Sequence, residues 1–526
     1  MFRRSRGIFA VGAAAIALAV AGCGGSSSSS SGSGGSTGGS SGGGASQSSN
    51  GTLTLGTNGT INSFAADDAN WGSVSPYYQA VYDTLLRESP SGQPEPGLAT
   101  SWSYNANRTA LTLQLRKGVK FTDGTPFNAA VAVANLKRFK TGGSANAAFL
   151  IRVASIEATG PYTVKLTFSQ PEPSILIYLA ENPGLQESPK AFTAKTVNTV
   201  PVGSGPYVYD ASASVPGSSY TFTKNPGYWD PSIQHYAKIV LKVYSSSQAM
   251  MDAIEGHQVN AALTSLEGSY ASQIKSAGYS IQDYDLGWVG MNLLDRGGKM
   301  NPALANVKVR QALNYAVDAK ALLKSVQYGY GRLTQQIFKP TTPGYVASLD
   351  STYSYNPAKA RELLKEAGYP NGFSLTMPGG ALFNTDLLTI VQQELSAIGV
   401  KVTYQPVTPQ DALAEILAPK WAALVLDTAN DGSPWNLVQF TVSPDAIWNP
   451  FHYSTPDVNN WIHTVQYGTT SQATAAATAL NKYLVQQAWF VPWYEADGFF
   501  VTDSNTSAVI QQDNYSPSLW NITPKS

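Results

Sequence analysis

Alternating apolar and polar residues predict strands at several places after residue 50. Leu111, Leu113 and Leu115 alternate with polar residues, and the same alternation recurs at 164–168 and 239–243. Every second side chain of a strand lies on the same face, so this pattern is typical of a strand with one buried face. We therefore expect half-buried strands in these three segments.

Helical spacing is equally clear in the second half of the chain. Asn356 followed by Pro357 is a typical helix start, and apolar residues over 360–367 then lie on one face. Thr385 is expected to cap a second helix, and a strand at 400–404 follows that helix after a single glycine. A helix that leads directly into a strand is an α/β unit, so we expect an α/β fold.

The first 22 residues differ sharply from the rest of the chain. Three arginines precede an uncharged apolar stretch at 8–22, which is shorter than the roughly 20 apolar residues that a membrane span requires. This order is typical of an export signal. The stretch ends in Val-Ala-Gly-Cys at Cys23 and resembles a bacterial lipobox, which implies cleavage before Cys23 and a lipid on its thiol. The alternative is a plain secretory signal followed by a chance cysteine.

Residues 23–50 are expected to form a flexible tether, because serine and glycine make up nearly all of them. The 27 residues after Cys23, 24–50, give an end-to-end distance on the order of 30 Å. Cys23 is the only cysteine, which excludes intrachain disulfides and CxxC-type metal or redox sites.

The length and the net charge of the chain limit the classes of protein to which it can belong. A chain of 526 residues is too long for one typical core, so two or three lobes are expected. It has 34 basic and 34 acidic residues, and removal of the three arginines of the signal leaves a net charge of −3. Without a basic stripe, nucleic acid is not an expected partner.

Six sequence blocks give a more specific indication, because they occur in the order found in a known family. They are 93–102 (QPEPGLATSW), 113–127 (LQLRKGVKFTDGTPF), 202–207 (VGSGPY), 225–229 (NPGYW), 309–318 (VRQALNYAVD) and 360–369 (ARELLKEAGY). Together they resemble the family 5 extracellular solute-binding proteins, the peptide, dipeptide and nickel binders of ABC importers. We expect the blocks to be mostly scaffold, with Arg116 and Asp123 forming a structural ion pair.

The resemblance implies a fold and a division into lobes. The expected fold is an α/β clamp of the periplasmic-binding-protein type II, with two large lobes joined by a hinge and a small extra lobe. Lobe I would comprise 51–80, 198–288 and 490–526, lobe II 81–197, and lobe III 289–489. The ligand would be enclosed between lobes I and III, which close about two crossover segments.

By their place in the family pattern, four regions are expected to face this cleft. Residues 64–71 replace the family's L-D-P loop, 288–292 lie at the first crossover, 427–435 resemble its D-x-x-D-P segment, and His452 lies in the following loop. In the peptide binders an aspartate of that segment holds the ammonium group of the ligand. The expected ligand-binding residues are Phe64, Asp68, Trp71, Trp288, Asn292, Trp421, Asp427, Asp431, Trp435 and His452. Core packing is the alternative for each tryptophan, and a turn is the alternative for Asp431.

The expected function is capture of a peptide-like or other small solute for an ABC permease and ATPase. The protein would be a monomer without a cofactor, lipid-anchored through Cys23 on the outer face of the membrane. A nickel site is not favoured, because the four histidines include no close pair. An enzyme is not expected, since the folded part has neither a G-x-S-x-G elbow nor an H-E-x-x-H motif. A ligand-sensing lipoprotein and a binder of oligosaccharides or metal chelates remain alternatives.

Overall fold

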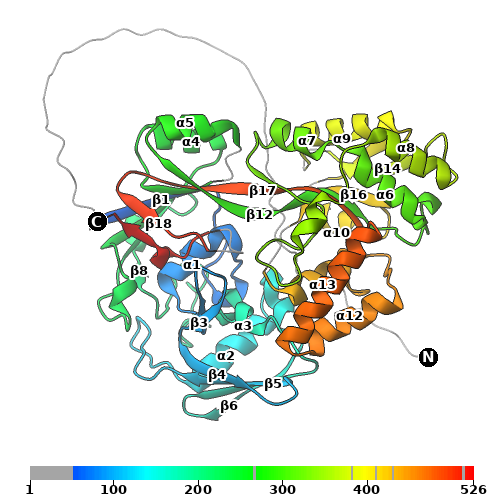
Figure 1. Cartoon of the computed structure of the whole chain (residues 1–526). Helices are drawn as coiled ribbons and strands as arrows, with labels where there is room; N and C mark the ends of the chain where they lie inside the picture. Colours follow the sequence, from blue (N-terminus) through cyan, green and yellow to red (C-terminus); the bar gives the residue numbers. More distant parts are fainter. Residues whose placement is uncertain are drawn as a thin grey trace, which may run out of the picture.

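Nine strands form one large sheet that extends from β8 at the left of Figure 1 to β16 at the right. The computed structural model describes residues 51–525 apart from gaps at 265–267, 381–382, 409–411, 429–431 and 512–515. In order, the sheet contains β16 (Ala423–Thr428), β12 (Ser280–Leu293), β17 (Phe490–Thr502), β11 (Ala261–Thr264), β1 (Thr52–Thr57), β10 (Lys238–Val243), β9 (Ser219–Lys224) and β8 (Tyr207–Tyr209), and β13 (Gly331–Leu333) pairs with β17. Strand β10 confirms the strand predicted at 239–243.

The strands β12 and β17 connect two separate hydrophobic cores. They run antiparallel from the pair Ser280 and Thr502 to the pair Asn292 and Phe490. One end packs against α4 (Ser247–Glu255) and α5 (Ala271–Ser276), and the other end against α6 (Val307–Ala316) and α7 (Ala319–Val326). Figure 1 shows both strands crossing the middle of the molecule between these helix pairs. We call β12 and β17 the crossover strands.

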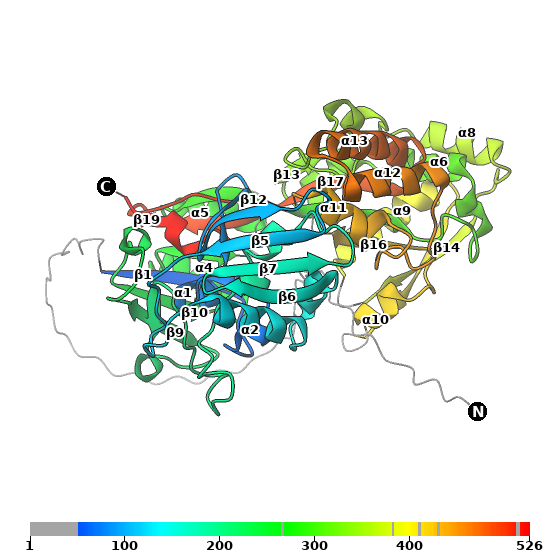
Figure 2. The same ribbon diagram turned by 90° about the horizontal axis from the view of Figure 1, so that it is seen from below.

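A second, four-stranded sheet has a core of its own. Its order is β4 (Ala99–Tyr104), β5 (Ala110–Leu115), β7 (Thr163–Phe168) and β6 (Val153–Gly160), and the helix α2 (Ala129–Lys140) contacts β6 and β7. Figure 2 shows this sheet from below. The buried residues of its core, as far as the structure describes the chain, lie between Leu85 and Ala180, and Trp229 packs against them. Strands β5 and β7 confirm the predictions at 111–115 and 164–168. We call this part the four-stranded lobe.

The α/β unit predicted around residue 400 is present beyond the crossover strands. Helix α8 (Pro357–Glu366) begins after the N-cap Asn356, as predicted. Helix α9 (Thr385–Ala397) leads into β15 (Lys401–Pro406), which pairs in parallel with β14 (Ser374–Gly379). The predicted cap at Thr385 is wrong by one residue, because the side chain of Asn384 accepts the Leu387 N–H.

Two long helices complete this end of the molecule. They are α12 (Pro456–Tyr467) and α13 (Thr470–Gln486), which pack against each other. Within the described ranges, no helix has the length and the apolar character that crossing a bilayer would need.

The blocks at 202–207 and 225–229 meet at one buried carboxylate, Asp83. Ser204 Oγ donates to it at 2.9 Å, Tyr228 Oη at 2.8 Å and Trp229 Nε1 at 3.0 Å. Burial raises the pKa of Asp83, and the neighbouring guanidinium of Arg87 and these three donors oppose the rise. The two blocks therefore build scaffold, as predicted.

The predicted ion pair between Arg116 and Asp123 is wrong. The Arg116 guanidinium lies 4.0 Å from the ring centroid of Trp229. The Asp123 carboxylate instead accepts from Ser188 Oγ at 2.7 Å and from the Thr125 N–H at 2.8 Å. A flat guanidinium stacks well on an indole, so Arg116 stabilises the scaffold by packing rather than by charge pairing.

Candidate functional site

Asp427 lies in one row with Val289 and Tyr494 across β16, β12 and β17. The backbone register pairs Val289 with Asp427 on one side and with Tyr494 on the other. Paired residues of neighbouring strands share a face of the sheet, so the Asp427 side chain points to the face that carries these two apolar neighbours. Both neighbours belong to the core formed with α6 and α9. A carboxylate is thus placed at the edge of an apolar layer.

The electrostatic environment of Asp427 is unfavourable for a free negative charge. Burial raises the pKa of this carboxyl to about 7. Among the described residues, neither an ion pair nor a hydrogen bond offsets that cost. Such a carboxylate is suited to a cationic group from outside the protein, because an opposite charge would favour its ionised form.

Trp288 points to the other face of the same strands. Its register partner is Thr428, one residue after Asp427, so the two predicted site residues lie on opposite faces of the sheet. Trp288 is fully buried and packs against Phe490, with 5.7 Å between ring centroids. Trp435 belongs to the same apolar cluster. These two tryptophans therefore occupy core positions, the alternative considered from the sequence.

Asn292 lies four residues after Trp288 on β12 and shares its face of the sheet. Its Nδ2 atom is 3.4 Å from Thr428 Oγ1, and its Oδ1 atom is buried without a partner in the described part of the chain. Trp288 and Asn292 therefore share one face of β12, and the Asp427 side chain points to the opposite face of the sheet.

The segment 64–71 is held against the four-stranded lobe. Asp67 forms an ion pair with Arg138 of α2, with 2.5 Å between Oδ1 and Nη2, and Arg138 also pairs with the buried Glu187. Asp68 is exposed, and its Oδ1 atom occupies the space that a Cβ atom at position 143 would need. Only the glycine present at position 143 leaves room for it. The segment is therefore fixed in place and leaves Asp68 as its accessible carboxylate.

The two aromatic residues of this segment differ in their surroundings. Phe64 is buried in the core beside β1 and contacts Tyr209 and Tyr220, with ring centroids 5.1 and 6.1 Å away. Trp71 is partly exposed, and its indole Nε1 has no hydrogen-bond partner in the described segments. Trp71 has the better access to a bound molecule.

The remaining predicted residues lie apart from the crossover strands or outside the described residues. Trp421 is buried in a third cluster and donates from Nε1 to the Glu415 carbonyl at 2.9 Å. His452 is exposed, with Nδ1 2.7 Å from the Pro444 carbonyl oxygen. Asp431 and Cys23 lie outside the described residues. No group of three or more potential metal ligands occurs in the described ranges.

A network between distant parts of the chain was not predicted from the sequence. Glu172 of the four-stranded lobe accepts a hydrogen bond from Trp435 Nε1 at 2.8 Å. The two residues are 263 positions apart, so no local pattern could indicate their contact. Only the rigid Pro-Glu-Pro sequence around Glu172 could have drawn attention to this position.

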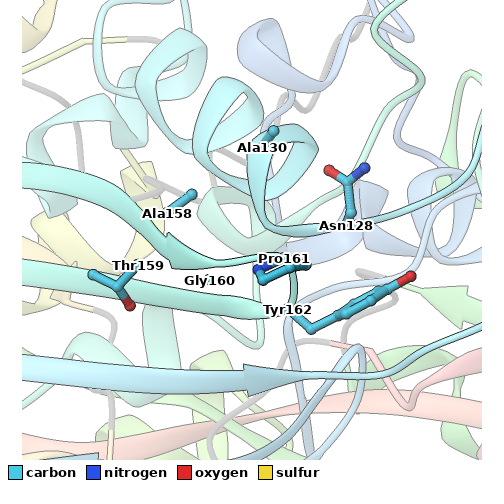
Figure 3. Close-up of a pocket in the computed structure, with 7 residues that line it drawn as sticks. All are labelled: Asn128, Ala130, Ala158, Thr159, Gly160, Pro161 and Tyr162. Atoms are coloured by element: carbon cyan, nitrogen blue, oxygen red, sulfur yellow. The ribbon is translucent and has the colours of Figure 1, made fainter.

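A surface hollow of about 410 Å³ lies on the four-stranded lobe, away from the predicted site. Figure 3 shows the start of α2 on one side of it and the turn between β6 and β7 on the other. Its lining residues are Asn128, Ala130, Ala158, Thr159, Gly160, Pro161 and Tyr162. These neutral side chains offer no charged anchor for a solute.

Comparison with known proteins identifies the family. Residues 93–458 match the model of the bacterial extracellular solute-binding proteins, family 5 Middle. The chain belongs to this family. The glutathione-binding protein GsiB of Escherichia coli K12 is 30% identical over 366 residues, which cover 67% of this chain and 68% of GsiB. The family consists of binding proteins that act outside the cytoplasm with an ABC permease and ATPase.

Solved structures have the same fold. HbpA2 from Haemophilus parasuis has a TM-score of 0.78 at 20% identity, and the match covers 90% of this chain and 100% of HbpA2. DppA from Helicobacter pylori, in complex with the peptide STSA, has a TM-score of 0.74 at 20% identity, covering 90% and 98%. NikA from Brucella suis, in complex with Fe(III)-EDTA, has a TM-score of 0.75 at 20% identity, covering 90% and 100%. The predicted α/β clamp of type II is confirmed.

Proposed function

We propose that this family 5 protein captures a peptide-like solute by lobe closure and delivers it to the permease of an ABC importer. The observation that carries the proposal is the pair of crossover strands, which two separate cores share. Two strands that join rigid bodies can act as a hinge, because small backbone changes there move whole lobes. The names of GsiB and of the peptide-bound DppA support a peptide-like ligand.

The lobe boundaries belong to the same proposal. Lobe I comprises 51–80, 198–288 and 490–526, lobe II 81–197, and lobe III 289–489. The separate core between Leu85 and Ala180 supports lobe II as a unit. Solute would be enclosed between lobes I and III, beside the crossover strands.

The ammonium group of a peptide-like solute would pair with a carboxylate of the segment 427–435. Asp427 is suited to this role, since no charge in the described part of the chain offsets its burial. Asp431, as the second aspartate of the segment, is the other candidate. Trp71 and Asp68 would contact the solute from lobe I, and ordered water would fill the remaining space and allow loose specificity.

The start of the chain would hold the protein near its membrane partner. Residues 1–22 would be removed as a signal peptide, Cys23 would carry the lipid, and 23–50 would form the tether. Mass spectrometry of the N-terminal peptide of the mature protein tests this part. A mature chain that begins elsewhere than at Cys23 contradicts it.

A thermal-shift panel tests the binding function. The full chain is heated with glutathione, Met-Leu, the peptide STSA, an oligosaccharide and a nickel–histidine complex. A ligand that binds only the folded state at 100 times its Kd stabilises that state by about 2.7 kcal/mol. We expect a peptide to raise the Tm. A shift with the sugar or the metal complex alone would favour the non-peptide alternatives.

The variants Asp427→Asn and Asp431→Asn test the ammonium contact. The affinity for the stabilising peptide should fall about tenfold or more in one of them, because a charge-assisted hydrogen bond is lost. Asp252→Asn, at an exposed site on α4, is the matched control. Unchanged affinity in both variants would remove this part of the proposal. Growth on the peptide as sole nitrogen source, with and without this gene, separates transport from sensing.

A further inference from the structure

A row of side chains joins the four-stranded lobe to the segment that follows β16. Glu172, Ser174 and Tyr178 lie on one side of it, and Ser433 and Trp435 belong to the other. We call this contact the seam. We define the seam by Phe149, Arg152, Glu172, Ser174 and Tyr178 on the four-stranded lobe, and by Ser433, Trp435, Asn436, Gln439 and Phe440 on the opposite side.

Hydrogen bonds across the seam are short and well distributed. Tyr178 Oη donates to Asn436 Oδ1 at 2.7 Å, and Gln439 Nε2 donates to Tyr178 Oη at 2.7 Å. The hydroxyl oxygens of Ser174 and Ser433 are 2.9 Å apart. Several aligned bonds of this kind define one relative position of the two parts.

Glu172 is the central charged group of the seam. Its carboxylate is 2% exposed, forms an ion pair with Arg152 at 3.0 Å, and accepts from Trp435 Nε1 at 2.8 Å. Arg152 in turn donates to Gln439 Oε1 at 2.7 Å and lies 5.1 Å from the Trp435 ring centroid. Burial raises the pKa of Glu172, and Arg152 opposes that rise. A buried carboxylate is costly to leave unpaired, so its partners are held firmly.

The seam is continuous with the candidate solute-binding segment. Trp435 lies in α11 (Pro434–Leu437), four residues after Asp431 and eight after Asp427. Ser433 caps this helix and faces Ser174. Any movement of the four-stranded lobe away from the seam therefore breaks contacts to the chain segment expected to hold the solute.

We propose that Glu172 is a positioning residue for solute binding: through Trp435 it fixes helix α11 against the four-stranded lobe and holds the clamp closed. This inference rests on the proposed function in one respect, because it takes closure of the clamp to be what retains the solute. The closing contact itself needs no ligand. Loss of the seam should therefore speed the release of solute more than it slows capture.

A cross-linking assay measures closure directly. The full chain carries Cys23→Ser, which removes its only thiol, together with Ser174→Cys and Ser433→Cys. A disulfide requires Cβ atoms about 3.5–4.5 Å apart, so it can form only while the seam is closed. The rate of disulfide formation under a mild oxidant reports the closed population.

Three further substitutions identify the role of Glu172. Glu172→Ala should slow disulfide formation about tenfold, because a charge-assisted hydrogen bond across the seam is lost. Trp435→Phe, which lacks the N–H, should have a similar effect, and the double variant should be little slower than either single one. Glu172→Gln keeps an acceptor oxygen and should restore part of the rate. Glu157→Ala, at an exposed site on β6, is the control.

The outcomes separate the seam from the function. Equal rates in all variants would overturn the positioning role, even if every protein binds peptide. Slower rates in the Glu172 and Trp435 variants without any response to glutathione would support the seam and count against glutathione as ligand. Should the double-cysteine chain not fold, the radius of gyration of the Glu172→Ala chain by X-ray scattering replaces the assay. An unchanged radius in solution would then overturn the proposal.

Discussion

Asp285 and Asp497 lie directly opposite each other on the two crossover strands. Like charges in paired strand positions repel, and Asp283 adds a third carboxylate one alternate position away. Burial, together with the charges of Asp283 and Asp285, raises the pKa of Asp497 to about 7, while Arg332 opposes the rise. The strands on which closure is proposed to depend thus carry an acidic pair that is least costly when one member is protonated.

The stability of the protein should therefore depend on pH through Asp497. The pKa in the folded state is raised from 3.8 to about 7, so the folded state binds more protons than the unfolded state between these values. The free energy of unfolding should fall as pH rises from about 4 to about 7, and it should stay at this lower value above pH 7. Asp497→Asn should flatten the profile and stabilise the protein at pH 8 by on the order of 1 kcal/mol, since the site is partly exposed.

Urea unfolding at pH 5 and pH 8 measures this difference. The described charges that act on this acidic cluster include Arg332, Lys275 near Asp283, and Glu495, which interacts with Asp285. Asp252→Asn, at an exposed site on α4, is the control. An identical pH slope in the Asp497→Asn variant and in the parent would show that the acidic pair does not titrate in this way.

Asp427→Asn should move stability and binding in opposite directions. Above pH 7 the ionised carboxylate is poorly compensated, because burial has raised its pKa to about 7. The neutral amide of the Asp427→Asn variant should therefore increase the free energy of unfolding of the ligand-free protein at pH 8 by about 1–2 kcal/mol. The same substitution should weaken the binding of a cationic solute. A variant that loses both stability and affinity would indicate that Asp427 serves the fold alone.

Asp83→Ala should be among the most destabilising single changes in the scaffold. Three donors, on Ser204, Tyr228 and Trp229, would lose their shared acceptor. Leaving buried polar groups unpaired costs about 3–5 kcal/mol when a charged partner is removed. Denaturant midpoints measure the loss, and Asp252→Ala, at an exposed position, should change them little. A loss below about 1 kcal/mol would contradict the central role of Asp83.

The regular elements could be predicted from the sequence because their signals are local. Alternation of apolar residues located β5 and β7, and the Asn-Pro start located α8. The cap of α9 was misplaced because Asn384 and Thr385 are adjacent and both are favoured N-cap residues, of which asparagine is the stronger. The blocks at 202–207 and 225–229 were correctly predicted to be scaffold, since the residues that donate to Asp83 belong to them.

The site was harder to predict, because an aromatic residue in the sequence can belong either to a binding pocket or to a core. A tryptophan that lines a pocket and one that fills a core are equally apolar, and Trp288 and Trp435 prove to be buried in one cluster. Phe64 likewise packs in a core. The seam could not be inferred at all, since Glu172 and Trp435 meet only through the tertiary fold. Charge balance around Asp427 also depends on neighbours that the sequence does not reveal.

Removal of Arg332 should weaken the crossover strands mainly at high pH. Arg332 extends from β13 to Glu495 of β17, with 2.6 Å between Nη2 and Oε1, and to Asp350 at 2.7 Å. Burial raises the pKa of Glu495 to about 7, so this carboxyl is charged at pH 8 and largely neutral at pH 5. Arg332→Gln should therefore lower the free energy of unfolding by about 1–2 kcal/mol at pH 8, because the partly exposed guanidinium is screened by solvent, and by clearly less at pH 5.

Urea unfolding at the two pH values measures this effect, with Arg361→Gln, at an exposed site on α8, as the control. The variant Arg332→Gln combined with Glu495→Gln should recover much of the loss at pH 8, because the uncompensated charge disappears with its partner. An equal loss at both pH values, without recovery in the double variant, would mean that Arg332 acts through packing against Tyr345 rather than through charge. Charge neutralisation and packing at the crossover strands are thereby told apart.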